Sequence, residues 1–127
     1  MMLVLTRIKP SSVHGLGLFA AELIREGTEV WEYNDPPDYR IPASSPLLKE
    51  EPWKSHRRYG YQEDGKPYVE FPGDCAMFIN HSVMNRNIRD EGDKVVATRD
   101  ILPDEELLEN YYEFESEPLE LEGLRDD

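Results

Sequence analysis

The chain has 127 residues, 39% of them hydrophobic, which suffices for one domain with a single core but not for two. It carries 14 basic and 27 acidic residues, and the net charge of −13 argues against direct binding to nucleic acid and favours basic partners. Cys75 is the only cysteine, so disulfides within the chain and a zinc cluster of several thiolates are excluded.

The N-terminal apolar run ends at Arg7, too soon for a signal peptide. No stretch approaches the roughly 20 apolar residues of a membrane span, so no contact with a membrane is expected. We therefore expect a cytoplasmic protein, or one secreted into a host by a route that needs no signal peptide.

The first third of the chain predicts short strands joined by turns. Residues 3–8 are a β-prone run that Pro10 ends, and residues 28–33 alternate polar with apolar as a half-buried strand does. Between them, Gly15 and Gly17 flank Leu16 directly before the strand-like residues 18–20. Glycines at this spacing form either a plain turn or a place where a ligand approaches the backbone, and the third glycine of a dinucleotide fingerprint is missing.

The middle of the chain predicts an insertion. Five prolines interrupt residues 34–52, which excludes a continuous sheet or helix there. Ser45 and Pro46 are placed to cap one short helix, and Pro52 to open another that runs to residue 58. Residues 59–61 and 68–71 are then expected to pair as a hairpin around the turn at residues 64–65.

An apolar run that begins at Ala76 stops abruptly at Asn80, His81 and Ser82. These side chains donate and accept hydrogen bonds in many directions, so they either form a ligand site or close an element as a cap or Asx turn. A further hairpin is predicted around residues 91–93, and residues 107–112 are predicted to form the last strand. The prediction is a mainly β fold with few short helices.

Four motifs along the chain resemble, in order, the SET domain of protein lysine methyltransferases. The resemblance covers residues 7–114 and lacks the cysteine-rich segments that often flank the domain. The residues that carry it are Gly15, Gly17, Phe19, Gly27, Glu32, Tyr33, residues 78–82, residues 99–101, residues 105–107 and Tyr111. The resemblance implies a SET-domain, β-clip-like fold of several small sheets, with a C-terminal pseudo-knot threaded under the loop at Asn80 and His81.

The resemblance also implies a domain at residues 1–115, in which residues 34–58 are a variable, proline-rich insert. Residues 116–127 would be an acidic tail, either a lid or disordered. The family uses S-adenosylmethionine and needs no metal. By resemblance, the cofactor would contact Gly15, Leu16, Gly17, Phe78, Asn80, His81 and Phe114. Tyr111 matches the catalytic tyrosine, and Tyr59 resembles the tyrosine that lines the lysine channel opposite it.

The chemistry that this resemblance implies requires mainly alignment. The methyl group sits on a sulfonium and leaves without acid assistance, whereas the lysine must be neutral although its ordinary pKa is about 10.4. A desolvated channel beside a sulfonium charge lowers that pKa, and positioning can supply about 7–11 kcal/mol of the barrier.

Several residues depart from the family pattern. Met77 stands where many members have an arginine that contacts the cofactor carboxylate. Either Asn85 or Asn87 takes the place of the asparagine that ends the family's next motif, and we prefer Asn87. Glu109 occupies a position where an aromatic residue often sets how many methyl groups fit. Either its carboxylate binds a protonated amine, or it points to solvent and Tyr112 rather than Tyr111 faces the channel.

Three functions therefore remain open. The first is a methyltransferase acting on lysines of a basic protein or peptide, the second a SET-like module that binds without transferring methyl groups, and the third an acidic scaffold that shields basic partners. The minimal length suggests a bacterial or viral origin, and the chain is expected to be a monomer or a homodimer. Truncation after residue 115 is expected to change the salt dependence of substrate binding if the acidic tail guides the substrate.

Overall fold

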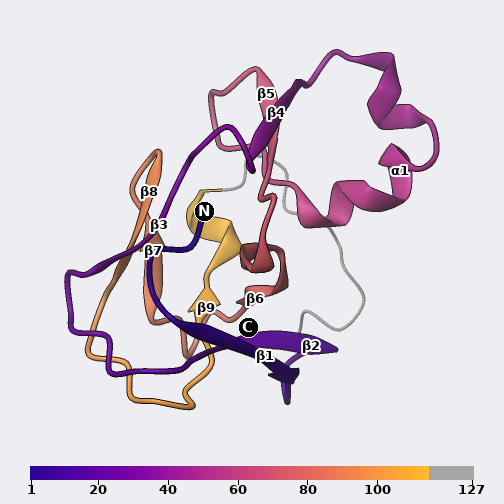
Figure 1. Ribbon diagram of the computed structural model, residues 1–127. Helices are drawn as coiled ribbons and strands as arrows, with labels where there is room; N and C mark the ends of the chain where they lie inside the picture. Colours follow the sequence, from indigo (N-terminus) through magenta and orange to yellow (C-terminus); the bar gives the residue numbers. More distant parts are fainter. Residues whose placement is uncertain (115–127) are drawn as a thin grey trace.

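Strands in four small sheets dominate this computed structural model, which describes residues 1–114 (Figure 1). β1 (Thr6–Pro10) pairs with β2 (Leu16–Ala20), and β4 (Tyr39–Pro42) with β5 (Tyr68–Phe71). A three-stranded antiparallel sheet has the order β3 (Glu29–Glu32), β8 (Lys94–Ala97) and β7 (Ile88–Asp90). The expected mainly β fold of several small sheets is confirmed.

The helices are short, and the longest continuous helical region lies in the insert. The 3₁₀ turn η1 (Pro46–Lys49) begins at Ser45, whose side chain accepts a hydrogen bond from the Leu47 backbone. α1 (Trp53–His56) follows Pro52 and continues into η2 (Arg57–Tyr59). Both helices predicted from these prolines are confirmed. Two further 3₁₀ turns, η3 (Cys75–Phe78) and η4 (Tyr111–Glu113), flank the remaining strands.

Three sequence predictions need correction. The proline-rich insert contains a strand, because β4 lies between its prolines and pairs with β5. Residues 59–61 therefore contribute only an isolated bridge, between Tyr61 and Glu70, on the other side of β5. The last strand is two residues long rather than six, because the Asn110 side chain accepts a hydrogen bond from the Tyr112 backbone and starts η4 there.

The smallest sheet lies at the centre of the molecule and determines the site. β6 (Asn80–His81) and β9 (Leu108–Glu109) pair in parallel, with Asn80 opposite Leu108 and His81 opposite Glu109. Parallel neighbours need a long connection, and here it consists of β7, β8 and the segment after them. This pairing brings residues 80–81 and residues 108–109 together (Figure 1). The pseudo-knot that the resemblance implies stays a prediction.

The core is apolar and packs mainly beneath the three-stranded sheet. Its members include Leu18, Ile24, Val30, Ile88 and Leu107, all at most 2% exposed. A bulge between Glu29 and Trp31 disrupts the alternation of β3, so that Val30 and Trp31 are both buried. The alternation predicted for this strand is therefore broken at its centre.

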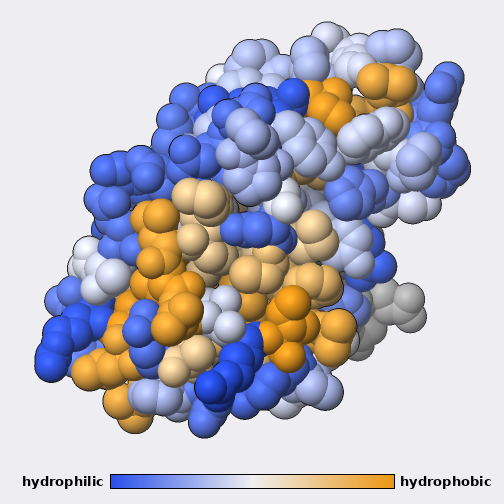
Figure 2. All heavy atoms as spheres, viewed as in Figure 1, coloured by the Kyte–Doolittle hydropathy of each residue, from blue (hydrophilic) through white to orange (hydrophobic). Residues whose placement is uncertain are grey.

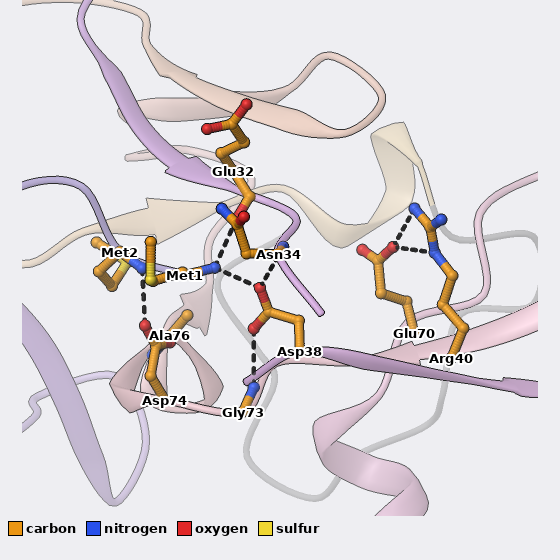
Figure 3. A network of polar contacts seen from close by, with 10 residues as sticks. All are labelled: Met1, Met2, Glu32, Asn34, Asp38, Arg40, Glu70, Gly73, Asp74 and Ala76. Carbon is orange, nitrogen blue, oxygen red and sulfur yellow. Dashed lines mark hydrogen bonds and ion pairs between the residues drawn. The ribbon is translucent and has the colours of Figure 1, made fainter. Parts of the chain in front are cut away.

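A buried carboxylate ties the insert to the rest of the molecule. Asp38, fully buried, accepts hydrogen bonds from the backbone of Asn34 and Gly73 and forms an ion pair with the Met1 ammonium group (Figure 3). An ionised carboxylate is tolerated in a protein interior when it is paired and hydrogen-bonded in this way. Asp38 therefore fixes the start of β4 relative to the end of β5.

Figure 2 shows apolar side chains gathered over the lower half of one face, where the N-terminal segment and β1 run. Leu3, Leu5 and Ile8 in this segment are each more than two-fifths exposed. Within residues 1–114, no helix is long and apolar enough to cross a membrane.

Candidate functional site

A cavity of about 310 Å³ lies between the glycine loop, η2 and β6. We call it the glycine-loop cavity. Its lining residues are His14, Gly15, Leu16, Arg58, Tyr59, Met77, Phe78, Ile79, Asn80 and Tyr111. Six residues predicted for the site, from four separate stretches of sequence, therefore lie around one space. The assignment of these residues to a cofactor stays a prediction at this point.

Asn80 holds the glycine loop against β6. Its side-chain amide donates hydrogen bonds to the carbonyl oxygens of His14 at 2.9 Å and Leu16 at 3.1 Å. Gly15 has a positive φ of 46°, which glycine adopts without strain, and open space surrounds the position of a Cβ. The loop backbone is thus fixed while its cavity side stays free of side chains. The Asn80 amide therefore donates its hydrogen bonds to other groups of the protein.

Gly17 is buried beside the cavity and is not part of its lining. A Cβ on Gly17 would lie 2.3 Å from a carboxylate oxygen of Glu106. That carboxylate accepts hydrogen bonds from the Asn80 amide at 3.0 Å and from the Ser11 hydroxyl at 2.8 Å. The neighbour that leaves no room for a side chain at Gly17 is therefore a carboxylate of the protein.

Tyr111 is fixed at both its backbone and its hydroxyl. Its backbone N–H donates to His81 Nδ1 at 3.0 Å, so this ring nitrogen carries a lone pair, and its hydroxyl donates to the carbonyl oxygen of Ile79. His81 itself is 1% exposed, and its ring lies 5.1 Å from that of Tyr111. His81 is a buried support of Tyr111 and does not line the glycine-loop cavity.

Of two neighbouring tyrosines, Tyr111 lines the cavity, whereas Tyr112 is 53% exposed. The ring of Tyr61 packs against Tyr111 at a centroid distance of 5.6 Å, and Tyr59 lines the same cavity from η2. Tyr61 was not predicted from the sequence as a site residue. The sequence Tyr59-Gly60-Tyr61 indicates that a tyrosine of this segment lies at the site. It does not show which of the two tyrosines contacts Tyr111.

Arg58 is a second residue that the sequence analysis missed. It lines the glycine-loop cavity together with Met77, and its guanidinium lies 3.1 Å from His14 Nε2. Because Met77 replaces an arginine of the family pattern, Arg58 is the cationic group available here for an anionic part of a ligand. Its signal was a basic run in the insert of an otherwise acidic chain.

A second cavity lies on the other side of Ile79 and has an acidic wall. We call it the acidic cavity, and its carboxylates are Glu63, Glu70, Asp90 and Glu109. The rest of its wall is aromatic or apolar: Trp31, Tyr61, Pro72, Ala76, Ile79, Val95 and Phe114. Ile79 lines both cavities, and Tyr61 and Phe114 pack on the ring of Tyr111. Phe114, expected at the cofactor, lies on this acidic side.

Glu109 faces this interior and is only 6% exposed. The alternative that Glu109 points to solvent is therefore wrong. Burial, and to a lesser extent the nearby charges of Glu113 and Glu63, raise the pKa of the Glu109 carboxyl to about 8. Burial and a hydrogen bond with Glu63 raise the pKa of Asp90 to about 9. The pKa of Glu70 is raised by burial, which outweighs its ion pair with Arg40 at 2.9 Å (Figure 3).

Asn87 clamps the strand that carries Glu109. It is 1% exposed, its amide donates to the carbonyl oxygen of Glu106 at 2.8 Å, and its side-chain oxygen accepts from the Leu108 N–H at 2.9 Å. Asn85 is exposed, and its backbone N–H donates to the Ser82 hydroxyl. Of the two candidate asparagines, Asn87 is thus the one built into the site.

No group of three or more histidine, cysteine, aspartate or glutamate side chains within residues 1–114 is arranged to hold a metal ion. This includes the carboxylates of the acidic cavity.

Comparison with known proteins decides the family. The sequence matches the SET domain family over residues 15–112, which include both motifs of the central parallel pair. The chain belongs to the SET domain family. The resemblance of its four motifs is thereby confirmed.

Solved structures with similar folds are SET-domain histone methyltransferases. A Plasmodium falciparum protein provisionally assigned as a histone methyltransferase is 26% identical, with a TM-score of 0.63 over 87% of this chain and 95% of that one. The polycomb repressive complex 2 of Chaetomium thermophilum gives 25% identity and a TM-score of 0.69 over 88% of this chain, in a structure bound to S-adenosylmethionine. Another structure of that complex covers 96% of this chain at a TM-score of 0.68.

The matched region is 16% of the Chaetomium chain, so this SET domain corresponds to a small part of that protein. A search of curated proteins found no match. The SET methyltransferase family uses S-adenosylmethionine. The bacterial or viral origin, the location in the cell and the oligomeric state stay predictions, and the expected acidic tail lies outside the described residues.

Proposed function

We propose that the chain transfers a methyl group from S-adenosylmethionine to a lysine side chain of a protein. The observation that carries this proposal is the parallel pairing of β6 with β9, which joins the Asn80 motif and Tyr111 around one cavity. Membership of the SET domain family and the neighbour bound to S-adenosylmethionine support it.

The glycine-loop cavity fits such a cofactor. It offers the Arg58 guanidinium for a carboxylate, loop carbonyls for an ammonium group and the rings of Tyr59 and Phe78 for apolar parts. S-adenosylmethionine, when bound, supplies an electrophilic methyl group on sulfur. Tyr111 and the backbone at Ile79 then orient the amine, because the Tyr111 hydroxyl and the Ile79 carbonyl already lie together at the boundary of the two cavities.

Two glycines provide a matched test of the cofactor site. Gly15 and Gly65 both have positive φ, of 46° and 79°, and both have open space around the Cβ position. An alanine therefore introduces similar backbone strain at either position, about 1–2 kcal/mol. Only Gly15 lines the cavity, so Gly15→Ala should weaken the binding of S-adenosylmethionine in calorimetry by tenfold or more, whereas Gly65→Ala should not. Equal affinities, or no binding to the wild type, would contradict the proposed cofactor site.

A second candidate function is a SET-like module that binds a basic protein without methyl transfer. Glu109 favours it, because a carboxylate stabilises the protonated form of a lysine and so opposes nucleophilic attack. We propose basic, lysine-containing protein segments as partners under both functions, since the net charge of the chain is −13. Methyl transfer to a basic protein separates the two functions.

A further inference from the structure

The acidic cavity contains a carboxyl group that the proposed reaction, as described so far, does not use. Glu109 is 6% exposed, lies on β9 two residues before Tyr111, and lines the acidic cavity. A buried carboxyl group without a cationic partner is unfavourable in its charged form, so its retention needs a reason. A transient cationic partner would supply one.

A second polar group in the same wall lacks a hydrogen-bond partner. The indole N–H of Trp31, a residue 5% exposed that lines this cavity, donates to no group in the described part of the chain. Glu109 and Trp31 come from different sheets and are both more than nine-tenths buried. A buried donor without a partner and a buried carboxyl group thus line one cavity, which is typical of a ligand site.

The dimensions and composition of this cavity indicate which chemical class of ligand it fits. The space open to the centre of a water molecule is about 30 Å³, which corresponds to about two waters. Such a slot admits the end of an extended alkyl chain. Its aromatic and apolar wall suits methylene groups, and its carboxylates suit a terminal cation. A primary alkylammonium group, as in lysine, meets all three requirements and can also give up a proton.

We propose that Glu109 is the proton acceptor of the methyl-transfer reaction. This inference rests on the proposed function. The Glu109 carboxylate binds the ε-ammonium group of the substrate and takes one proton, so that an N–H bond breaks, its electron pair stays on nitrogen and an O–H bond forms on Glu109. The neutral amine then uses its electron pair to form the new N–C bond. The C–S bond breaks at the same time, and the electron pair of the C–S bond stays on sulfur. Glu109 returns its proton to water after the product leaves.

The electrostatic surroundings match this role. A base works best when its pKa lies near the operating pH, and burial raises the pKa of Glu109 to about 8. The same desolvation lowers the pKa of an amine that enters the cavity, so the two values approach each other. Arg40 forms ion pairs with Glu70 and Asp93. The ionisable groups around Glu109 are Glu63, Glu70, Asp90, Tyr61, Glu113 from η4 and His81 from β6.

The first test needs no methyl transfer and compares the wild type with Glu109→Gln, which keeps the shape and removes the base. n-Butylammonium serves as the probe, and its binding is followed by NMR shifts at pH 8.5. We expect millimolar binding to the wild type and at least tenfold weaker binding to Glu109→Gln. Glu91→Gln is the control, because Glu91 is an exposed acid in the turn between β7 and β8 and should leave binding unchanged. Equal binding by the wild type and Glu109→Gln, or no binding by the wild type, would overturn the inference.

The second test uses poly-L-lysine as methyl acceptor and measures single-turnover rates from pH 7 to pH 10. Loss of a general base should lower the rate about a hundredfold or more near pH 7.5, and the deficit should shrink as solution deprotonates the amine at higher pH. A purely structural defect would be constant across this range. A rate for Glu109→Gln equal to or above that of the wild type means that the carboxylate only holds the amine protonated, and the inference fails.

Calorimetry with S-adenosylmethionine on the same proteins separates this inference from the proposed function. Glu109 does not line the glycine-loop cavity, so we expect the same affinity in the wild type and in Glu109→Gln. If neither protein binds the cofactor, the proposed function fails, while the n-butylammonium experiment still decides whether Glu109 is a cation site.

Discussion

At the scale of single residues, hydrogen bonds between residues of the site fix their positions relative to one another. His81 accepts from the Tyr111 backbone, Tyr111 donates to Ile79, and Asn80 donates to the glycine loop. Each of these contacts joins residues at least 30 positions apart, so each depends on the tertiary fold. A site held in this way is preorganised, which is the condition for alignment to contribute to a rate.

Glu109 should lower the stability of the folded protein in a pH-dependent manner. Its pKa is raised to about 8 in the folded state from 4.5, so between these values the unfolded chain binds fewer protons and the free energy of unfolding falls as pH rises. Glu109→Gln removes this effect. We expect it to raise the free energy of unfolding at pH 8–9 by up to about 4 kcal/mol and to have little effect near pH 4.5.

Urea unfolding of the wild type and Glu109→Gln at several pH values measures this difference. A gain in stability that is independent of pH would show that packing, and not the charge of Glu109, is responsible. A gain in stability together with a loss of the proposed activity would be the trade-off expected of a functional residue.

At the scale of elements, the parallel pair of β6 and β9 is short, and side chains stabilise it. Asn87 satisfies two buried backbone groups, the carbonyl of Glu106 and the N–H of Leu108. Local sequence pattern located both partners of this pair but not their pairing, because residues 80–81 and 108–109 are distant in sequence. Only the resemblance to the SET domain implied that the C-terminal strand lies at the loop of Asn80 and His81. The burial of Glu109 follows from that pairing and could not be derived from local pattern.

Asn87→Ala should therefore destabilise the protein by about 2–4 kcal/mol, because it leaves two buried backbone groups without partners. Asn85→Ala should change stability by less than about 0.5 kcal/mol, because Asn85 is exposed. Thermal unfolding of both variants measures the contrast. Similar melting temperatures would mean that the pair of strands is stable without its clamp.

The strand β4 illustrates the other limit of sequence analysis. Prolines correctly predicted the two short helices of the insert, since their effect on the backbone is local. β4 was missed because its stability comes from pairing with β5, about 30 residues later. Residues 59–61, which are closer in sequence, were predicted to pair with residues 68–71, and the structure keeps one antiparallel bridge of this pairing, between Tyr61 and Glu70.

At the scale of the whole molecule, charge separates the two sides of the site. The chain carries a net charge of −13, four carboxylates line the acidic cavity, and Arg58 lies on the glycine-loop side. Under the proposed function, the carboxylates of the acidic cavity would attract a basic substrate, and Arg58 would meet an anionic group of the cofactor.

Substrate binding should accordingly depend on ionic strength. Exposed charges are screened over about 8 Å at physiological salt, and this attraction acts chiefly on association. We expect the KM for a basic polypeptide to rise severalfold between about 50 mM and 300 mM salt while kcat changes little. Steady-state kinetics at several salt concentrations measures both, and a KM that is independent of salt would show that the acidic surface only solvates the protein.

The most direct test of the proposed function is transfer of a labelled methyl group from S-adenosylmethionine to protein lysines, read by amino-acid analysis of an acceptor such as core histones. The wild type should produce methyllysine. Tyr111→Phe should lower the rate about a hundredfold or more, because it removes the hydroxyl that lies at the boundary of the two cavities, and Tyr112→Phe should not, because Tyr112 is 53% exposed. Cofactor binding without any methyllysine from the wild type, or equal rates for the wild type and Tyr111→Phe, would contradict this account.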